Sequence, residues 1–276
     1  MTARPTSADR YNVPALTRGL HLLMQFNRDE RELSGAELSR RLGLPRASVF
    51  RMLFTLEQSG FLERCPDGVS YKLGLAVLRL GFELLASMEL TEVGRPVIEV
   101  LRDRCGFSAH LVVRDVREVV FIAKAAGSNS MFHSIQVGAR LPAHATVLGR
   151  TLLSDLDMKE LAALYPEKTL PAYTPKTPTS LPALKVLIDQ DRDKGYGVSM
   201  GGYETGISTI AAPVFNEQGR VTAAISITVP SQRIEDEALM PLVDLVKTAS
   251  AQLTERLSYS LQRRSRPAQN KDKKTS

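Results

Sequence analysis

Cysteine is nearly absent from this chain, which has only Cys65 and Cys105 among its 276 residues. Two cysteines cannot build a disulfide framework or a four-cysteine zinc site, so we expect a reducing compartment, the cytoplasm. The histidines do not have the HxxxH or HExxH spacing of a metal site. A Walker motif, a nucleophile elbow and a pair of catalytic carboxylates are also missing. We therefore expect no metal, no cofactor and no enzymatic activity.

Long apolar runs are missing as well. The longest, residues 73–90, contains Arg79, Glu83 and Glu89, which a helix crossing a bilayer would have to bury. The first eleven residues are polar and lack the apolar core of a signal peptide. We therefore expect neither membrane attachment nor a secretion signal.

The net charge of +6 is unevenly distributed. Residues 262–276 contain six Lys or Arg and one Asp, and residues 1–73 contain eleven Lys or Arg against eight Asp or Glu. The stretch between them is slightly acidic, which argues against nucleic-acid binding along the whole chain. Because residues 262–276 have almost no apolar side chains and repel one another, we expect a disordered basic tail there.

Residues 33–73 have the pattern of a winged helix-turn-helix. Ser34 and Glu37 have the spacing of a capping box, and Gly43 is suited to end the short helix that follows. Pro45 suits the first turn of a second helix, where its missing N–H would have no partner. Four apolar residues at helical spacing then form one stripe along that helix: Val49, Met52, Leu53 and Leu56.

The opposite face of the second helix is short, polar and basic, with Ala47, Ser48, Arg51 and Thr55. Such a face can enter a major groove and bond bases or phosphates. Two β-prone runs, residues 60–64 and 69–73, flank an Asp-Gly turn signal and predict the wing. An amphipathic helix over residues 14–26 completes a three-helix core. The sequence therefore predicts a DNA-binding domain.

The rest of the chain predicts a mixed α and β domain after a linking helix at residues 75–90. The apolar stripe of that helix suits either a partner helix from another subunit or packing on its own domain. Two antiparallel pairs of strands are expected, with a Pro- and Thr-rich surface loop at residues 165–182. The expected strands are residues 108–113, 118–124, 207–215 and 221–229, and the expected helices are residues 91–105, 148–153, 158–164, 184–194 and 235–261.

Both halves of the chain resemble the IclR-type transcriptional regulators. In the first half the matching segments are residues 14–20 (PALTRGL), 34–38 (SGAEL), 43–53 (GLPRASVFRML), 56–62 (LEQSGFL) and 71–74 (YKLG). In the second half they are residues 138–150 (GARLPAHATVLGR), 195–199 (GYGVS), 204–215 (ETGISTIAAPVF) and 223–227 (AAISI). The segments follow in the same order from about residue 11 to residue 261.

The resemblance implies an α+β fold. It places a winged helix-turn-helix at residues 11–74, a linker helix at 75–90 and a GAF-like α/β effector-binding domain with an antiparallel sheet at 91–261, followed by the tail. It also implies a homodimer, or a tetramer built from dimers.

The DNA-contact candidates lie on the second helix, just before it and on the wing. Arg51 is placed to form a bidentate bond to guanine, and the others to contact phosphates or the minor groove. Phe50 would meet a thymine methyl group, with a role in the core or in a dimer as the alternative. The full set is Arg40, Arg46, Ala47, Ser48, Phe50, Arg51, Arg64 and Lys72, with Arg41 beside Arg40.

The effector-site candidates come from the resemblance together with the residue chemistry. The family binds a small acid against the sheet, under the segment that here is Thr146, Val147 and Leu148, with polar groups at positions matching Ser199, Thr209, Ser226 and Thr228. Buried hydroxyls need partners, and a ligand carboxylate would supply them, as would neighbouring carbonyls. Amides at a helix start near Thr146 would add positive potential.

We therefore expect a ligand-responsive regulator that binds a palindromic operator in double-stranded DNA and senses a small carboxylate of the glyoxylate or pyruvate type. An aromatic acid is the alternative effector. An enzyme targeted by a winged helix and an RNA-binding or architectural protein are the alternatives from other classes. The sequence does not distinguish a repressor from an activator.

Overall fold

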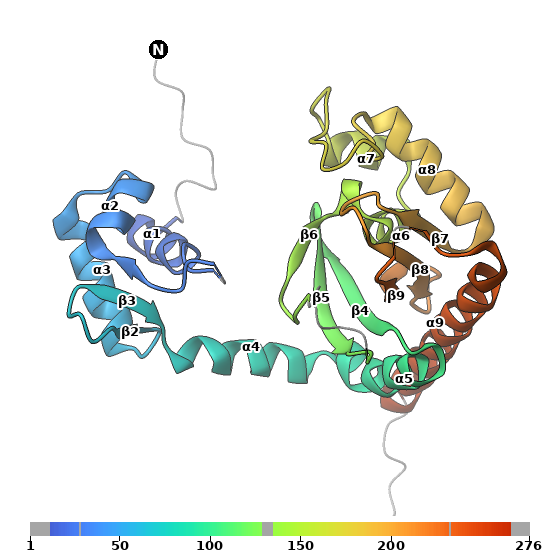
Figure 1. Ribbon diagram of the computed structural model, residues 1–276. Helices are drawn as coiled ribbons and strands as arrows, with labels where there is room; N and C mark the ends of the chain where they lie inside the picture. Colours follow the sequence, from blue (N-terminus) through green and yellow to red (C-terminus); the bar gives the residue numbers. More distant parts are fainter. Residues whose placement is uncertain (1–11, 28, 129–134, 232, 266–276) are drawn as a thin grey trace, which may run out of the picture. The chain divides into compact units, whose positions relative to one another are not determined.

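The computed structural model describes residues 12–27, 29–128, 135–231 and 233–265. The chain divides into two compact units, Met1–Ser87 and Met88–Ser276, and each is described by itself (Figure 1). Within the described ranges, no helix is both long and apolar enough to span a membrane.

The first unit is the winged helix-turn-helix that the sequence predicts. Its three strands form one antiparallel sheet in the order β1-β3-β2 (Figure 1). Its elements are α1 (Pro14–Leu23), β1 (Leu33–Ser34), α2 (Gly35–Leu42), α3 (Arg46–Gln58), β2 (Leu62–Arg64), β3 (Ser70–Leu73) and α4 (Leu75–Ser87).

Local chemistry sets the helix boundaries of this unit. The Ser34 hydroxyl accepts the N–H of Glu37 at the start of α2, and Gly43 ends that helix with a φ of 63°. Helix α3 begins at Arg46, and Pro45, expected in its first turn, is its N-cap. At the wing, the carboxylate of Asp67 accepts two backbone N–H groups, those of Val69 and Ser70.

The core of the first unit joins α1, α2 and α3 to the sheet. Val49 and Leu53 of the predicted stripe are 1% exposed, and Met52 and Leu56 are packed against the same cluster. The strand β1 was not predicted, because it is only two residues long and depends on pairing with β3. The other buried members are Leu22, Phe26, Leu33, Leu38, Leu62 and Tyr71.

The expected linker helix ends at Ser87, and a separate helix, α5, begins at Glu89 after the N-cap residue Met88. Four leucines of α4 are exposed: Leu75, Leu78, Leu80 and Leu84.

The second unit contains a six-stranded antiparallel sheet in the order β6-β5-β4-β9-β8-β7, which curls around part of its core (Figure 1). Its strands are β4 (Ser108–Asp115), β5 (Glu118–Ala125), β6 (Arg140–Pro142), β7 (Gly197–Met200), β8 (Ser208–Phe215) and β9 (Val221–Val229). Its helices are α5 (Glu89–Cys105), η1 (Ala143–Ala145), α6 (Val147–Leu152), α7 (Met158–Leu164), α8 (Leu181–Lys194) and α9 (Asp236–Ser265).

Each face of this sheet is covered by different helices. On one face α5 approaches closely at Gly94, where a Cβ atom would lie 2.5 Å from the Leu111 side chain and 3.4 Å from that of Leu253 in α9. On the other face, residues of α6 such as Val147 pack in one cluster with Val112 of the sheet. The sheet therefore separates two apolar layers, and α6 covers the face that bears the candidate effector residues.

The two hairpins were predicted, and the edge strands β6 and β7 were not, since three- and four-residue strands carry little alternation. Helix α9 continues to Ser265, so residues 262–265 of the expected tail are helical. Residues 266–276 lie outside the described residues.

Candidate functional site

The exposed face of α3 carries the predicted DNA-contact residues. Arg46, Ala47 and Arg51 are exposed and Ser48 is half-buried. Phe50 is 58% exposed, so it does not belong to the core of its own unit. Phe54, one turn further along, is also exposed and was not singled out from the sequence.

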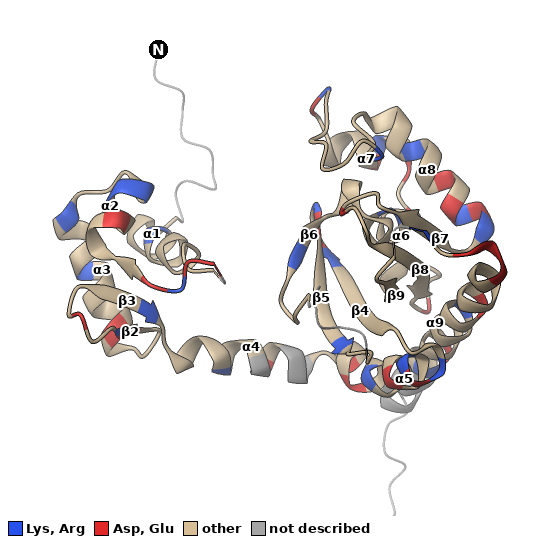
Figure 2. Ribbon diagram, in the orientation of Figure 1, with Lys and Arg blue, Asp and Glu red and all other residues tan. Residues whose placement is uncertain are grey.

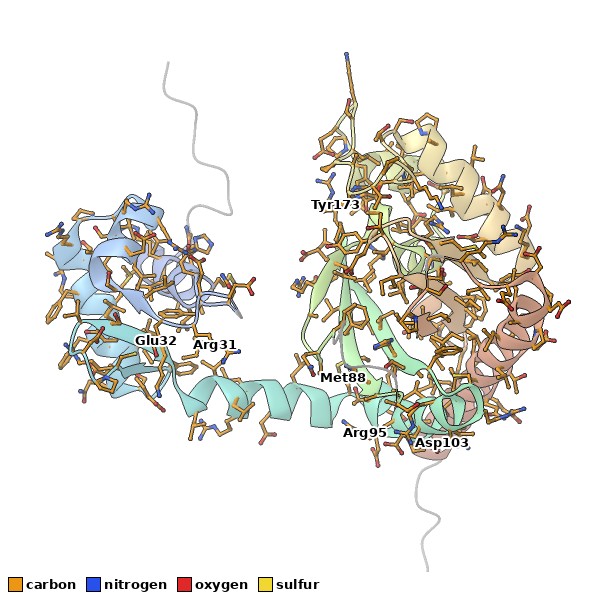
Figure 3. The ribbon with its side chains drawn as sticks, in the orientation of Figure 1. Arg31, Glu32, Met88, Arg95, Asp103 and Tyr173 are labelled. Atoms are coloured by element: carbon orange, nitrogen blue, oxygen red, sulfur yellow. The ribbon has the colours of Figure 1, made fainter. Side chains whose placement is uncertain are left out.

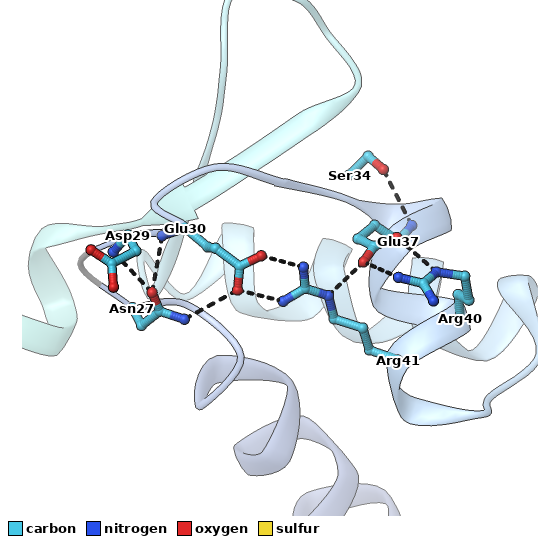
Figure 4. Close-up of polar contacts among 7 residues, drawn as sticks. All are labelled: Asn27, Asp29, Glu30, Ser34, Glu37, Arg40 and Arg41. Atoms are coloured by element: carbon cyan, nitrogen blue, oxygen red, sulfur yellow. Dashed lines mark hydrogen bonds and ion pairs between the residues drawn. The ribbon is translucent and has the colours of Figure 1, made fainter. Parts of the chain in front are cut away.

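The arginines of α2 are held by acidic residues (Figure 4). Arg41 donates to Glu30 and to Glu37, with a distance of 2.6 Å from its Nε to the Glu37 carboxylate, and Arg40 also donates to Glu37. Hydrogen bonds from Arg41 lower the pKa of Glu30 to about 2, and those from Arg40 and Arg41 lower the pKa of Glu37 to about 2. The positive electrostatic potential at α2 is therefore weaker than its number of arginines suggests.

The wing cations are also paired. Arg64 lies 3.2 Å from a carboxylate oxygen of Glu57 and over the ring of Tyr71, and Lys72 lies 3.3 Å from Glu63. In the described part of the chain, the side chains of Arg46 and Arg51 form no ion pair. Figure 2 shows the basic residues of α2 and α3 on the same unit. Among the predicted DNA-contact cations, the two without an ion pair to any described residue, Arg46 and Arg51, thus lie on α3.

The second candidate site is a cavity of about 50 Å³ between α6 and the sheet of the second unit. Six of the seven predicted effector residues line it: Thr146, Val147, Leu148, Ser199, Thr209 and Thr228. Ser226 is fully buried and is not among the lining residues. The other lining residues, which sequence reasoning missed, are Phe121, Ile135, Leu141, Gly202, Tyr203, Glu204 and Ile207.

The hydroxyl groups at this cavity differ in what they already bond. The Thr146 hydroxyl accepts the N–H of Gly149 at 3.0 Å and donates to the carbonyl of Pro142, so it caps α6. The Ser199 hydroxyl accepts the N–H of Gly202 at 3.2 Å. Thr209 and Thr228 lie opposite each other on β8 and β9 and both face the cavity. This pair therefore offers the least occupied hydroxyls.

The loop at residues 165–182, expected to be a surface loop, forms hydrogen bonds to the segment that lines one side of the cavity. The Thr174 hydroxyl lies 2.9 Å from the carbonyl oxygen of Gly202, and the Thr177 hydroxyl lies 2.8 Å from the same oxygen. The ring of Tyr173 (Figure 3) lies 5.0 Å from that of Tyr203, which lines the cavity. No local sequence signal marks these contacts, because the hydrogen-bonded partners are 28 and 25 residues apart.

The charges around the cavity limit what it can hold. None of its lining residues, within the described ranges, is Lys or Arg, and the exposed Glu204 lies at its edge. Among the described residues there is also no group of three or more His, Cys, Asp or Glu placed to hold a metal ion.

Comparison with known proteins identifies both units. Residues 15–66 match the IclR helix-turn-helix domain, and residues 82–255 match the bacterial transcriptional regulator IclR C-terminal domain. The regulator XynR of Escherichia coli is 30% identical over 247 residues, which are 90% of this chain and 98% of XynR.

Solved structures agree in fold. A transcriptional regulator of Rhodococcus sp. RHA1 has a TM-score of 0.78 at 30% identity, covering 89% of this chain and 98% of its own. An IclR homologue of Microbacterium hydrocarbonoxydans, solved with 4-hydroxybenzoate, has a TM-score of 0.76 at 27% identity, covering 88% of this chain and 98% of its own. The matched domains and relatives are regulators rather than enzymes, and this chain belongs to the IclR family of DNA-binding bacterial transcriptional regulators.

Proposed function

We propose that this regulator binds a small monocarboxylate in the cavity under α6, and that binding changes its affinity for a palindromic operator in the cytoplasm. The observation that carries the proposal is the pair of facing hydroxyls, Thr209 and Thr228, in a cavity of about 50 Å³. A carboxylate accepts several hydrogen bonds at once, which suits hydroxyls that need acceptors. A water needs ~10–15 Å³ of such volume, so the cavity has room for roughly three to five groups of that size.

The ligand charge follows from the lining residues. A dianion would have no countercharge beside it, and burying an unpaired charge is costly. A single carboxylate bonded to hydroxyls and backbone amides costs less, and an oxo acid of the glyoxylate or pyruvate type is the smallest ligand of this class. An aromatic acid is the second candidate, favoured by the 4-hydroxybenzoate in the Microbacterium relative. Isothermal titration with glyoxylate, pyruvate and benzoate separates the two.

The DNA contacts are assigned by charge and exposure. Arg51 reads a base and Phe50 contacts a thymine methyl group, while the unpaired Arg46 contacts a phosphate. Arg40, Arg64 and Lys72 reach phosphates by exchanging their present acidic partners, and Ala47 and Ser48 allow the close approach of α3.

A homodimer supplies the two readers that a palindrome requires, because half-sites one DNA turn apart are separated by about 34 Å. The exposed leucines of α4 give the dimer an apolar contact, and pairs of dimers give a tetramer. Light scattering at micromolar concentration tests this assembly, and a monomer that still binds a palindrome tightly would exclude it.

The decisive experiment for the whole proposal is fluorescence anisotropy on operator DNA across a panel of small carboxylates. A change in operator affinity with one of them supports the proposal. Unchanged affinity across a panel that includes both aliphatic and aromatic acids would overturn it.

A further inference from the structure

Two polar atoms beneath the cavity have no hydrogen-bond partner among the described residues: Nδ1 of His110 and the hydroxyl oxygen of Ser226. His110 is 3% exposed and Ser226 is fully buried, so bulk water does not reach either atom. They occupy directly opposite positions on β4 and β9. A buried polar atom without a partner is costly, and two of them at facing positions indicate a missing group that bonds to both.

The strand register puts this pair under the cavity. Side chains alternate along a strand, so Thr228 and Ser226 of β9 lie on the same face of the sheet. On β4, His110 lies opposite Ser226, and Val112, two residues on, lies opposite Phe121 of β5. Thr228 and Phe121 both line the cavity. Paired residues on neighbouring strands form a row across the sheet. The row of His110 and Ser226 therefore lies between the row that contains Thr228 and the row that contains Phe121, and both of these residues line the cavity.

The contact between the rings of His110 and Phe121 agrees with a position of His110 next to the cavity. The ring of Phe121 meets the ring of His110 edge-on, with 5.4 Å between their centroids. Phe121 also lines the cavity, so the imidazole and the cavity share this side chain as a neighbour. Rows on one face of a strand are about 6.6–6.8 Å apart, a distance that one short ligand and its hydrogen bonds can bridge.

The chemistry of the pair selects the missing group. Burial, together with the ammonium of Lys124, lowers the pKa of His110 to about 4, so its ring is neutral near pH 7. A neutral imidazole presents either a donor or an acceptor at Nδ1, and a serine hydroxyl can be both. A ligand hydroxyl complements either arrangement, because it donates one hydrogen bond and accepts another. A carbonyl oxygen can only accept.

We propose that His110 and Ser226 bind a hydroxyl group of the effector, which makes the effector a hydroxy carboxylate with its carboxylate at Thr209 and Thr228. This inference rests on the proposed function and narrows its ligand class. Glyoxylate meets the requirement as its hydrate, in which water has added across the C=O bond to give two hydroxyls on one carbon.

The test compares acids that differ by one hydroxyl: glycolate with acetate, and 4-hydroxybenzoate with benzoate. By isothermal titration on the full chain, the hydroxylated member of at least one pair should bind about tenfold more tightly, as expected for one additional buried hydrogen bond. In His110→Phe and in Ser226→Ala this ratio should fall to about one, while the affinity for the acid without the hydroxyl stays the same.

The matched control is Thr91→Val, which also removes a buried hydroxyl without a partner among the described residues but lies on α5, away from the cavity. It should keep the tenfold preference. A second measurement needs no variant: the ¹⁵N resonance of His110 Nδ1 should shift with the hydroxylated acid and not with its partner.

Equal binding within both pairs, with no ¹⁵N shift, overturns this inference and leaves the proposed function intact. A preference that survives both His110→Phe and Ser226→Ala also overturns it. If none of the four acids binds to the wild-type chain, this inference fails, and the proposed function is decided separately by the wider carboxylate panel that includes glyoxylate and pyruvate.

Discussion

Arg150 and Asp191 form a buried ion pair, with 2.7 Å between Nε and Oδ2, that joins α6 to α8. Their side chains are 7% and 12% exposed, and Arg150 also donates to the carbonyl of Val198 in β7. Helix α6 and strand β7 both contribute lining residues to the cavity, through Leu148 and Ser199. One guanidinium therefore connects two of its walls.

We expect Arg150→Met to lower the free energy of unfolding by about 3–5 kcal/mol, because it leaves the Asp191 carboxylate buried without its partner. The double variant Arg150→Met/Asp191→Leu should recover most of the loss, since well-packed apolar residues can replace a buried ion pair. Denaturant titration of the second unit measures both. A double variant as unstable as the single one would contradict this explanation.

We expect Arg51→Ala to weaken binding to the operator by about 1–3 kcal/mol and to relax the base preference at one position of each half-site. The matched control is Arg40→Ala, which removes a guanidinium already paired with Glu37. It should weaken binding to all sequences alike. Anisotropy with an operator and with single-base variants gives both results, and an unchanged base preference in Arg51→Ala would exclude Arg51 from base reading.

The acidic partners of α2 predict a pH dependence. The pKa values of Glu30 and Glu37 fall from 4.5 to about 2 on hydrogen bonding to Arg41 and Arg40, so the folded unit binds these protons less tightly than the unfolded chain does. Their contribution is complete above about pH 4.5 and is lost as the pH falls toward 2.

The protection factors of the α2 amides, measured by NMR in the full chain and corrected for the intrinsic pH dependence of exchange, should therefore fall as the pH drops over that range. The double variant Glu30→Gln/Glu37→Gln should show a smaller change over the same range. An equal loss of protection in both proteins would mean that other groups set the acid limit.

We expect Thr228→Val to abolish the response of DNA binding to the effector without unfolding the second unit, because it removes one hydroxyl from the cavity and keeps the shape of the side chain. Ser226→Ala should instead shift the response to a hydroxylated acid to about tenfold higher concentration and leave the response to an acid without the hydroxyl unchanged. The comparison variant is Glu204→Gln, which removes the negative charge at the edge of the cavity and should tighten binding of a monocarboxylate. Titration calorimetry measures affinity, and a full response in Thr228→Val would place the ligand elsewhere.

Features that depend on near neighbours in the chain can be predicted from the sequence. The Ser34 cap, the left-handed Gly43 and the Asp67 turn each involve residues within three positions of one another, so a motif is enough to predict them. Two apolar runs separated by a turn likewise predict β8 and β9, and the register of these strands then sets Thr209 opposite Thr228.

Which of the predicted groups remain available to bind DNA or a ligand depends on contacts between distant segments. Arg41 is neutralised by Glu30, eleven positions away, and the Thr146 hydroxyl is used by the cap of α6. Tyr203 reaches the cavity because a distant loop holds its neighbour Gly202. The same hydroxyl or guanidinium can be free or bonded, and which it is depends on contacts that the chain makes only when distant segments pack together.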